Sequence, residues 1–169
     1  MKINFTLAKH QDLPAIIAIY NQTIASRMVT ADIEPVTVGQ REQWFKSFDV
    51  HHPLWKICNE EDNILGWIGL EPFYGRPAYQ HTSEIAIYID QDARHMGLGT
   101  QSLNFVIGQL PNLNISAIVA YIFGHNKPSL NLFKKFGFTE WGKFPKVAEL
   151  DGIQRDLIIL GRRFDMDTY

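Results

Sequence analysis

The stretch IAIYIDQDARHMGLGT, residues 85–100, joins a strand-like apolar run to a short polar turn that opens an amphipathic helix. The glycines of the turn, Gly97 and Gly99, let a backbone approach a ligand closely. The free N–H groups of the turn and of the first helical residues converge with the positive end of the helix dipole, which suits an anion such as a pyrophosphate. An ordinary strand-to-helix turn is the alternative, because glycine spacing alone is a weak signal.

The spacing of this turn excludes two common nucleotide-binding motifs. A P-loop has a lysine followed by Ser or Thr after its second glycine, and Leu98, Gly99 and Thr100 include no lysine. A Rossmann fingerprint has a third Gly or Ala where Ser102 stands. The segment resembles instead the acetyl-CoA signature of the GCN5-related N-acetyltransferase (GNAT) superfamily, Arg/Gln-x-x-Gly-x-Gly/Ala, which stands here as RHMGLG at residues 94–99.

Composition favours a soluble protein with a small partner. The chain has 169 residues, enough to bury a core without metals or disulfides, and we expect a single domain over residues 1–169. A net charge of -2 without a Lys/Arg run argues against nucleic acid or an anionic membrane as partner. No apolar run is long enough to span a bilayer, so we expect a cytoplasmic location. No Cys/His cluster has metal-ligand spacing, so no metal is expected, and Cys58 is interpreted as a core thiol.

Hydrophobic periodicity predicts a mixed α/β sheet with helices on both faces, in the order β-α-α-β-β-β-α-β-α-β-β. Strands are expected at residues 3–7, 55–59, 64–70, 84–89, 117–123, 140–147 and 155–161. Helices are expected after Asp12, at about 39–48, after the glycine turn, and from Asn126 to Gly137. The order resembles the GNAT fold, a central mixed, mostly antiparallel sheet of about seven strands flanked by four helices. In that fold the fourth and fifth strands splay apart to admit the cofactor.

Several short segments are similar to one branch of the superfamily, the phosphinothricin and methionine sulfoximine acetyltransferases, which acetylate the α-amino group of small amino-acid-like substrates. These segments are Ile19-Tyr20-Asn21, Asp32-Ile33-Glu34-Pro35, Glu71-Pro72-Phe73 with Arg76 and Tyr79, Thr82-Ser83-Glu84, Gly124-His125-Asn126 with Pro128-Ser129, and Gly137-Phe138. The resemblance implies acetyl-CoA as the acyl donor, a small-molecule amine as the acceptor, and a homodimer.

The resemblance also implies a set of cofactor-binding residues. Backbone groups of Ile87, Tyr88 and Ile89 would hold the pantetheine arm, and Asn126 and Ser129 would reach the cofactor from the start of a later helix. The residues expected around the pyrophosphate are Arg94, His95, Met96, Gly97, Leu98, Gly99 and Thr100. Core packing is the alternative role for the two isoleucines, and Asn126 has the alternative role of a helix N-cap.

Glu84 is the candidate catalytic residue. It is a carboxylate at the start of an apolar strand, where partial desolvation disfavours the ionised form and raises the pKa. Acetyl transfer to an amine needs such a base, because a primary amine is largely protonated at neutral pH. The relatives place a glutamate at this position in this role. A strand-end carboxylate facing solvent is the alternative, and His81 is a second candidate for proton relay.

Three further positions are predicted to shape the acceptor pocket. Arg76 and Tyr79, in the loop that leads to Glu84, would bind a substrate carboxylate, and a surface arginine stacked on an aromatic ring is the alternative. Ala31 stands where herbicide-inactivating relatives have a bulky aromatic residue, and we therefore expect a roomier pocket.

One departure from the family concerns the general acid. Many relatives carry Tyr or His seven residues after the asparagine, to protonate the departing thiolate, and Phe133 stands there in this chain. Phe133 is best interpreted as a core residue. Three alternatives follow: the coenzyme A thiolate leaves unassisted, another acid such as Tyr121 or Tyr88 acts, or the site is catalytically weak.

The leading hypothesis is an acetyl-CoA-dependent N-acetyltransferase that acetylates a small amino acid or analogue by direct attack in a ternary complex. A non-catalytic acyl-CoA-binding module, suggested by Phe133, is one alternative. A peptide or protein N-terminal acetyltransferase is another, and it would need an open groove in place of a closed pocket.

Overall fold

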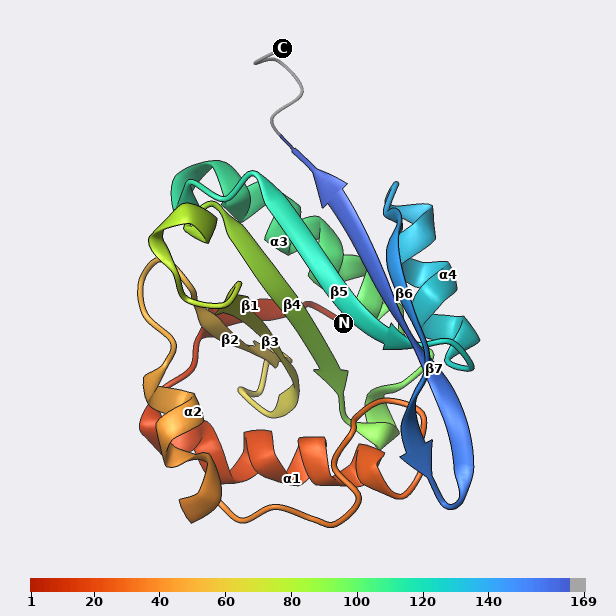
Figure 1. Cartoon of the computed structure of the whole chain (residues 1–169). Coiled ribbons are helices and arrows are strands. Elements are labelled where there is room, and N and C mark those ends of the chain that lie inside the picture. Colours follow the sequence, from red (N-terminus) through yellow and green to blue (C-terminus); the bar gives the residue numbers. More distant parts are fainter. Residues whose placement is uncertain (165–169) are drawn as a thin grey trace.

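The computed structural model describes residues 1–164, and its strands form a seven-stranded sheet in the order β1-β2-β3-β4-β5-β7-β6 (Figure 1). The strands are β1 (Asn4–Leu7), β2 (Leu54–Cys58), β3 (Ile64–Pro72), β4 (Thr82–Ile89), β5 (Ala117–Phe123), β6 (Thr139–Leu150) and β7 (Ile153–Arg163). The helices are α1 (Leu13–Ile24), α2 (Glu42–Lys46), α3 (Leu98–Leu113) and α4 (Lys127–Lys135). The predicted order of elements and the fold class are confirmed. The single domain expected over 1–169 includes residues 165–169, which lie outside the described residues, and stays a prediction.

The second helix is shorter than the sequence predicts. Residues Gly39–Arg41 form a 3-10 turn closed by the Arg41 N–H bond to the Val38 carbonyl at 3.0 Å, and α2 proper follows it. Glycine is a poor helix former, and the tighter 3-10 turn is common at helix starts. Arg41 therefore stands at the junction between the 3-10 turn and α2, and its side chain projects from that point.

Helices cover both faces of the sheet (Figure 1). On one face, α3 and α4 contribute Leu103, Val106, Leu110, Leu130 and Phe133 to the larger core cluster. On the other face, α1 and α2 contribute Ile16, Ile19, Tyr20, Ile24, Trp44 and Phe45 to a second cluster. Successive side chains of a strand point to opposite faces, and β4 follows this rule. Ile85, Ile87 and Ile89 face α3, whereas Ala86 and Tyr88 face α1.

The fourth and fifth strands separate, as the resemblance implies. Their parallel pairing runs from Thr82 opposite Ala117 to Glu84 opposite Val119, and no described pair lies beyond it. Past this point β4 pairs with β3 on its other edge, and β5 stays paired with β7 along its whole length. The edge of β4 after Glu84 therefore presents backbone N–H and C=O groups to an opening in the sheet.

Smaller predictions are also confirmed. Asp151 and Gly152 form the turn between β6 and β7, with φ values of 52° and 78°. Cys58 is buried in β2 and takes no part in a disulfide. No helix within residues 1–164 is long and apolar enough to cross a membrane.

Substitution of Gly66 tests how tightly β4 is held against β3, and substitution of Gly108 in α3 serves as the comparison. A Cβ atom at Gly66 would lie 2.5 Å from the Tyr88 backbone carbonyl, so Gly66→Ala forces the strands to shift and should lower the free energy of unfolding by about 1–3 kcal/mol. Gly108, inside α3, has open space at the same position, so Gly108→Ala should raise stability by about 0.5–1 kcal/mol. Urea unfolding of both variants measures this. Equal stability of Gly66→Ala and the wild type would contradict the packing described for β3 and β4.

Candidate active site

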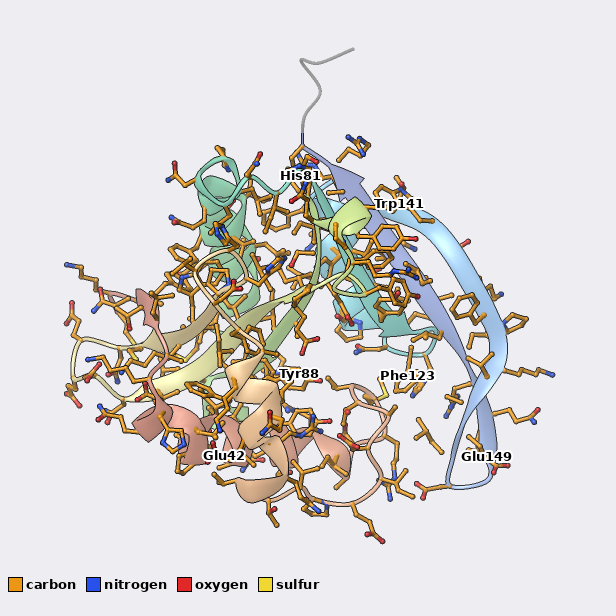
Figure 2. The ribbon with its side chains drawn as sticks, turned by 60° about the vertical axis from the view of Figure 1, so that its left-hand side comes forward. Glu42, His81, Tyr88, Phe123, Trp141 and Glu149 are labelled. Atoms are coloured by element: carbon orange, nitrogen blue, oxygen red, sulfur yellow. The ribbon has the colours of Figure 1, made fainter. Side chains whose placement is uncertain are left out.

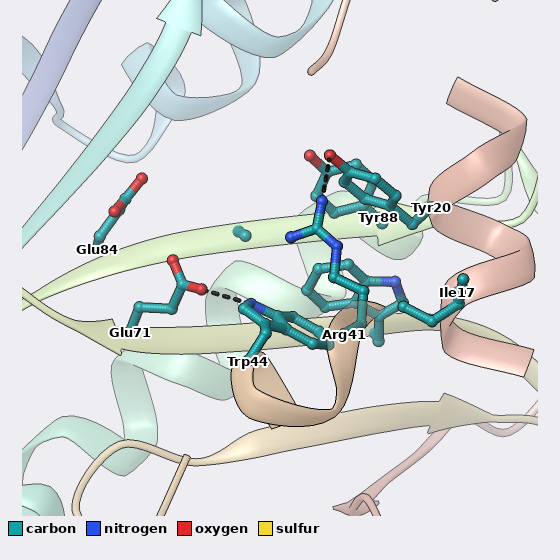
Figure 3. Close-up of a pocket in the computed structure, with 9 residues that line it drawn as sticks. Ile17, Tyr20, Arg41, Trp44, Glu71, Glu84 and Tyr88 are labelled. Atoms are coloured by element: carbon teal, nitrogen blue, oxygen red, sulfur yellow. Dashed lines mark hydrogen bonds between the residues drawn. The ribbon is translucent and has the colours of Figure 1, made fainter. Parts of the chain in front are cut away.

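Two cavities meet at Glu84. The first, here called the splay cavity, has a volume of about 490 Å³ and lies where β4 and β5 separate. The second, here called the aromatic pocket, has a volume of about 190 Å³ and lies between β3, β4, α1 and the start of α2 (Figure 3). Glu84, Ala86 and Tyr88 line both. A molecule in either cavity therefore reaches the same carboxylate.

Glu84 carries a strongly perturbed carboxyl group. Burial raises its pKa from the ordinary value to about 7, and the negative charge of Glu71 adds to this rise. The two residues stand directly opposite each other in the β3–β4 register. A carboxyl group with a pKa near neutrality is suited to accept and release protons at physiological pH.

Glu71 is fixed from the other side by α2. The Trp44 Nε1–H donates a hydrogen bond to Glu71 Oε1 at 2.6 Å (Figure 3). This hydrogen bond holds the Glu71 side chain in the position from which its negative charge acts on Glu84. Sequence reasoning placed Glu71 only within a family-like segment. Its pairing with Glu84 depends on strand register, which one chain does not reveal.

Arg41 lies away from Glu84 along the aromatic pocket (Figure 3). Its Nη2 donates to Asp32 Oδ2 at 2.6 Å and to the Tyr20 hydroxyl at 3.2 Å. Tyr20 in turn donates to Asp32 and hydrogen-bonds Thr30 Oγ1 at 2.5 Å. Burial, followed by the bond to Asp32, raises the pKa of Tyr20. This network fastens the loop after α1 to α1 itself and to the start of α2.

The walls between these two ends are aromatic. Trp67 stacks on Tyr88 with ring centroids 4.6 Å apart, and Trp44 meets Trp67 edge-on at 5.3 Å. Burial raises the pKa of Tyr88, and its hydroxyl lies at the Arg41 end of the pocket in Figure 3. Tyr88 therefore stands apart from the point where the splay cavity meets Glu84.

Tyr121 stands on the other side of the splay cavity, on β5. Burial raises its pKa to about 12, and a hydrogen bond to Tyr74 and the charges of Tyr74 and Glu84 act in the same direction. The phenol consequently keeps its proton at neutral pH. Phe133 also lines this cavity and is buried against Phe138, with ring centroids 5.1 Å apart, so its interpretation as a core residue is consistent with its position.

The glycine turn has the backbone geometry that an anion cradle needs. His95 and Gly97 have φ values of 64° and 74°, and α3 begins at Leu98 without a side-chain cap. The first N–H groups of a helix have no intrahelical acceptor, so those of α3 are directed out of its N-terminus. A Cβ atom at Gly97 would meet nothing within 4 Å, which leaves the approach open. Arg94, Met96 and Thr100 are exposed beside it.

Most of the other predicted cofactor residues border the splay cavity, and Ile89 does not. Ile87 and Tyr88 line it from β4, whereas Asn126 and Ser129 line it from the start of α4. Asn126 Oδ1 also accepts the Ser129 backbone N–H at 3.3 Å, so Asn126 does act as an N-cap. Ile89 packs against the α3 side of the core. Their contacts to a cofactor stay predictions.

The residues predicted to bind the acceptor are not brought together. Arg76 and Tyr79 lie in the exposed loop before β4 and line neither cavity, and the Tyr79 ring packs near Phe73 at 5.4 Å. Ala31 lines the splay cavity. His81 is exposed, and its Nδ1 lies 2.8 Å from the Asn114 carbonyl oxygen. Within residues 1–164, no group of three or more His, Cys, Asp or Glu side chains is placed to hold a metal ion.

Comparison with known proteins shows clear similarity. The model of the acetyltransferase (GNAT) family matches residues 16–138. YwnH of Bacillus subtilis, provisionally named a phosphinothricin acetyltransferase, is 54% identical over 92% of this chain and 96% of its own. The L-methionine sulfoximine/L-methionine sulfone acetyltransferase of Pseudomonas aeruginosa is 27% identical over 91% of this chain and 90% of its own. A crystal structure of a GNAT superfamily phosphinothricin acetyltransferase from Sinorhizobium meliloti, in complex with acetyl-CoA, has a TM-score of 0.89 at 23% identity, and covers 97% of this chain and 89% of that one.

Glu71→Gln tests the electrostatic coupling between the paired glutamates. Replacing the charged carboxylate by a neutral amide removes the repulsion that disfavours ionised Glu84, so the pKa of Glu84 should fall below about 7 while staying above its ordinary value, because burial remains. Carboxyl carbon NMR of selectively labelled protein measures the titration. An unchanged Glu84 pKa in this variant would show that Glu71 does not act on it.

Proposed function

This chain belongs to the GNAT family of acetyltransferases and is an acetyl-CoA-dependent N-acetyltransferase, and we propose that its acceptor is the α-amino group of a small amino acid or amino-acid analogue. One observation carries the proposal. Glu84, whose pKa is raised to about 7, stands where an opening between two strands meets a small pocket with aromatic walls. The names of the relatives, which refer to phosphinothricin and methionine sulfoximine, support an amino-acid-like acceptor.

The residues present fit acetyl-CoA as the acyl donor. The free edge of β4 offers backbone groups to the amide groups of the pantetheine arm. The splay cavity of about 490 Å³ beside this edge has room for the arm. The uncapped start of α3, with Gly97 open to approach, suits the pyrophosphate. Asn126 and Ser129 border the same cavity from α4. When bound, acetyl-CoA would supply an activated thioester, and these residues would hold it with its acetyl group near Glu84.

We propose that the acceptor amine occupies the aromatic pocket and attacks the thioester directly in a ternary complex. The neutral amine attacks the thioester carbon, and Glu84 takes one proton from the nitrogen as the new C–N bond forms and the C–S bond breaks to release the coenzyme A thiolate. Backbone N–H groups on the free edge of β4 stabilise the charge that develops on the carbonyl oxygen. Placing both reactants at one carboxylate supplies the proximity that the bimolecular reaction lacks in solution.

Tyr121 is the proposed donor of a proton to the departing thiolate. It lines the splay cavity near Glu84, and its raised pKa of about 12 keeps the phenol protonated at neutral pH. Phe133, at the position where relatives are expected to carry an acid, has no proton to give. Tyr88 is the weaker candidate because its hydroxyl lies at the Arg41 end of the aromatic pocket.

A homodimer is also proposed, and the β6–β7 hairpin supports it. This hairpin forms one edge of the sheet (Figure 2) and exposes several apolar side chains. They are Trp141, Phe144, Val147 and Ile153, with exposed fractions of 47%, 47%, 60% and 52%. Exposed apolar groups that gather in one element are typical of protein interfaces. The cytoplasmic location stays a prediction.

Glu84→Gln tests the proposed base. The amide holds the same shape but cannot accept the proton, so thiol release from acetyl-CoA should fall by about 100- to 10,000-fold across amino acids, methionine sulfoximine and phosphinothricin. In the wild type, kcat/KM should fall as pH drops below about 7, since protonated Glu84 is inactive as a base. Glu61→Gln, on the exposed turn between β2 and β3, is the matched control and should keep wild-type turnover.

Two outcomes would contradict this assignment. Full turnover in Glu84→Gln would remove Glu84 from the chemistry. Tight acetyl-CoA binding by the wild type, with no turnover on any amine, would instead favour a non-catalytic acyl-CoA-binding module.

Tyr121→Phe tests the proposed acid. Loss of the phenol proton should lower kcat by about 10- to 100-fold and leave the KM for acetyl-CoA near its wild-type value, because only the departing thiolate uses that proton. Steady-state kinetics with a thiol-release assay measure both constants. A wild-type kcat would mean that the thiolate leaves without help from this residue.

A further inference from the structure

We propose that Arg41 recognises an acidic group of the acceptor, so that the aromatic pocket selects amines that also carry a carboxylate. This inference rests on the proposed function, because it names a second recognised group of the same acceptor. Arg41 lines the aromatic pocket together with Glu71 and Glu84. Figure 3 shows the guanidinium separated from both carboxylates along the pocket, so one end of the pocket carries the two glutamates and the other carries Arg41, whose charge is paired with Asp32.

The guanidinium has donors available for a ligand. An arginine side chain carries five N–H donors in a rigid fork. Within residues 1–164, the hydrogen bonds of Arg41 leave from Nη2, to Asp32 and to Tyr20. Its other terminal nitrogen points along the pocket toward the Glu84 side in Figure 3. One edge of the fork is therefore anchored to the protein, and the remaining donors are free to bind a carboxylate.

The protein also holds Arg41 in place before any ligand arrives. The ion pair with Asp32 measures 2.6 Å, and the guanidinium carbon lies 4.9 Å from the centroid of the Tyr20 ring. The Arg41 side chain is 26% exposed, so most of it is already withdrawn from water. A donor fixed in this way loses little conformational freedom on binding, and its hydrogen bonds are strengthened by partial burial.

The charges match a zwitterion better than a simple amine. An ammonium group is attracted to Glu71 and Glu84, and a carboxylate is attracted to the unoccupied edge of Arg41. Trp44 and Trp67 form apolar walls for the rest of the acceptor. By contrast, Arg76, the arginine that the sequence suggests for this role, lies in an exposed loop and lines neither cavity.

The test compares an amino acid with the amine that remains after its carboxylate is removed, for example L-methionine and 3-(methylthio)propylamine. The measured quantity is the ratio of kcat/KM for the two acceptors. Wild-type enzyme should favour the amino acid. In Arg41→Gln this ratio should fall by about 10- to 100-fold, through a higher KM for the amino acid, as expected for lost charge-assisted hydrogen bonds. The intrinsic reactivities of the two amines cancel when variant and wild type are compared.

Arg41→Lys and acetyl-CoA binding provide controls. Lysine keeps the positive charge and can still pair with Asp32, but it lacks the planar fork, so the ratio should take an intermediate value. The KM for acetyl-CoA should not change in either variant, because Arg41 does not line the splay cavity. If Arg41→Gln melts at a lower temperature than the wild type, the test rests on Arg41→Lys, which keeps the pairing with Asp32. An intermediate ratio of kcat/KM values in Arg41→Lys then supports the inference, and a wild-type ratio contradicts it.

Three results would overturn the inference, and they are distinguishable. An unchanged ratio in Arg41→Gln, with amino acid still acetylated, would show that Arg41 does not recognise the carboxylate. A ratio that collapses in Arg76→Gln and not in Arg41→Gln would assign recognition to the exposed loop. If the wild type acetylates neither acceptor nor any other small amine, the proposed function fails and this inference fails with it.

Discussion

The free backbone edge of β4 is the constraint from which the site follows. A strand inside a sheet normally pairs on both sides, yet β4 pairs with β5 only as far as Glu84 and then runs beside an opening. Exposed N–H and C=O groups in such a place need a partner. An extended ligand with amide groups can provide one. The interruption of the sheet therefore removes strand pairing and, in exchange, leaves backbone groups that a ligand can bind. The glycine turn and α3 follow directly at the end of the same strand.

Because side chains alternate along β4, one face of the strand packs in the core and the other borders the cavities. The isoleucines on the α3 face anchor the strand in the larger core cluster. Glu84, Ala86 and Tyr88 on the opposite face border both cavities. Because Glu84 stands where regular pairing ends, it is buried enough to raise its pKa and still within reach of both cavities. The Glu84 carboxyl group is thus positioned by the sheet itself, and α2 adjusts its environment through Trp44 and Glu71.

The parts of the site that sequence analysis could predict are local in the chain. The residues 85–100 carry strand, turn and helix start in one continuous segment, so their pattern is visible in a single sequence. Glu71 and Arg41 were missed for a different reason. Glu71 meets Glu84 through the register of β3 on β4, and Arg41 reaches the aromatic pocket through the way the loop after α1 folds back onto Tyr20. Arg76 is predicted from a family-like segment in the loop that leads to Glu84, and the structure places that loop on the exposed surface.

The wall shared by the two cavities also limits what the enzyme can transfer. With the acyl donor in the splay cavity as proposed, its acyl chain would extend past Glu84 toward the aromatic pocket, whose volume is about 190 Å³. Every methylene added to the acyl group then occupies space that the acceptor would fill. In the proposed arrangement, a preference for a short acyl group and a preference for a small acceptor would have the same cause, and a change that enlarges one tolerance would alter the other.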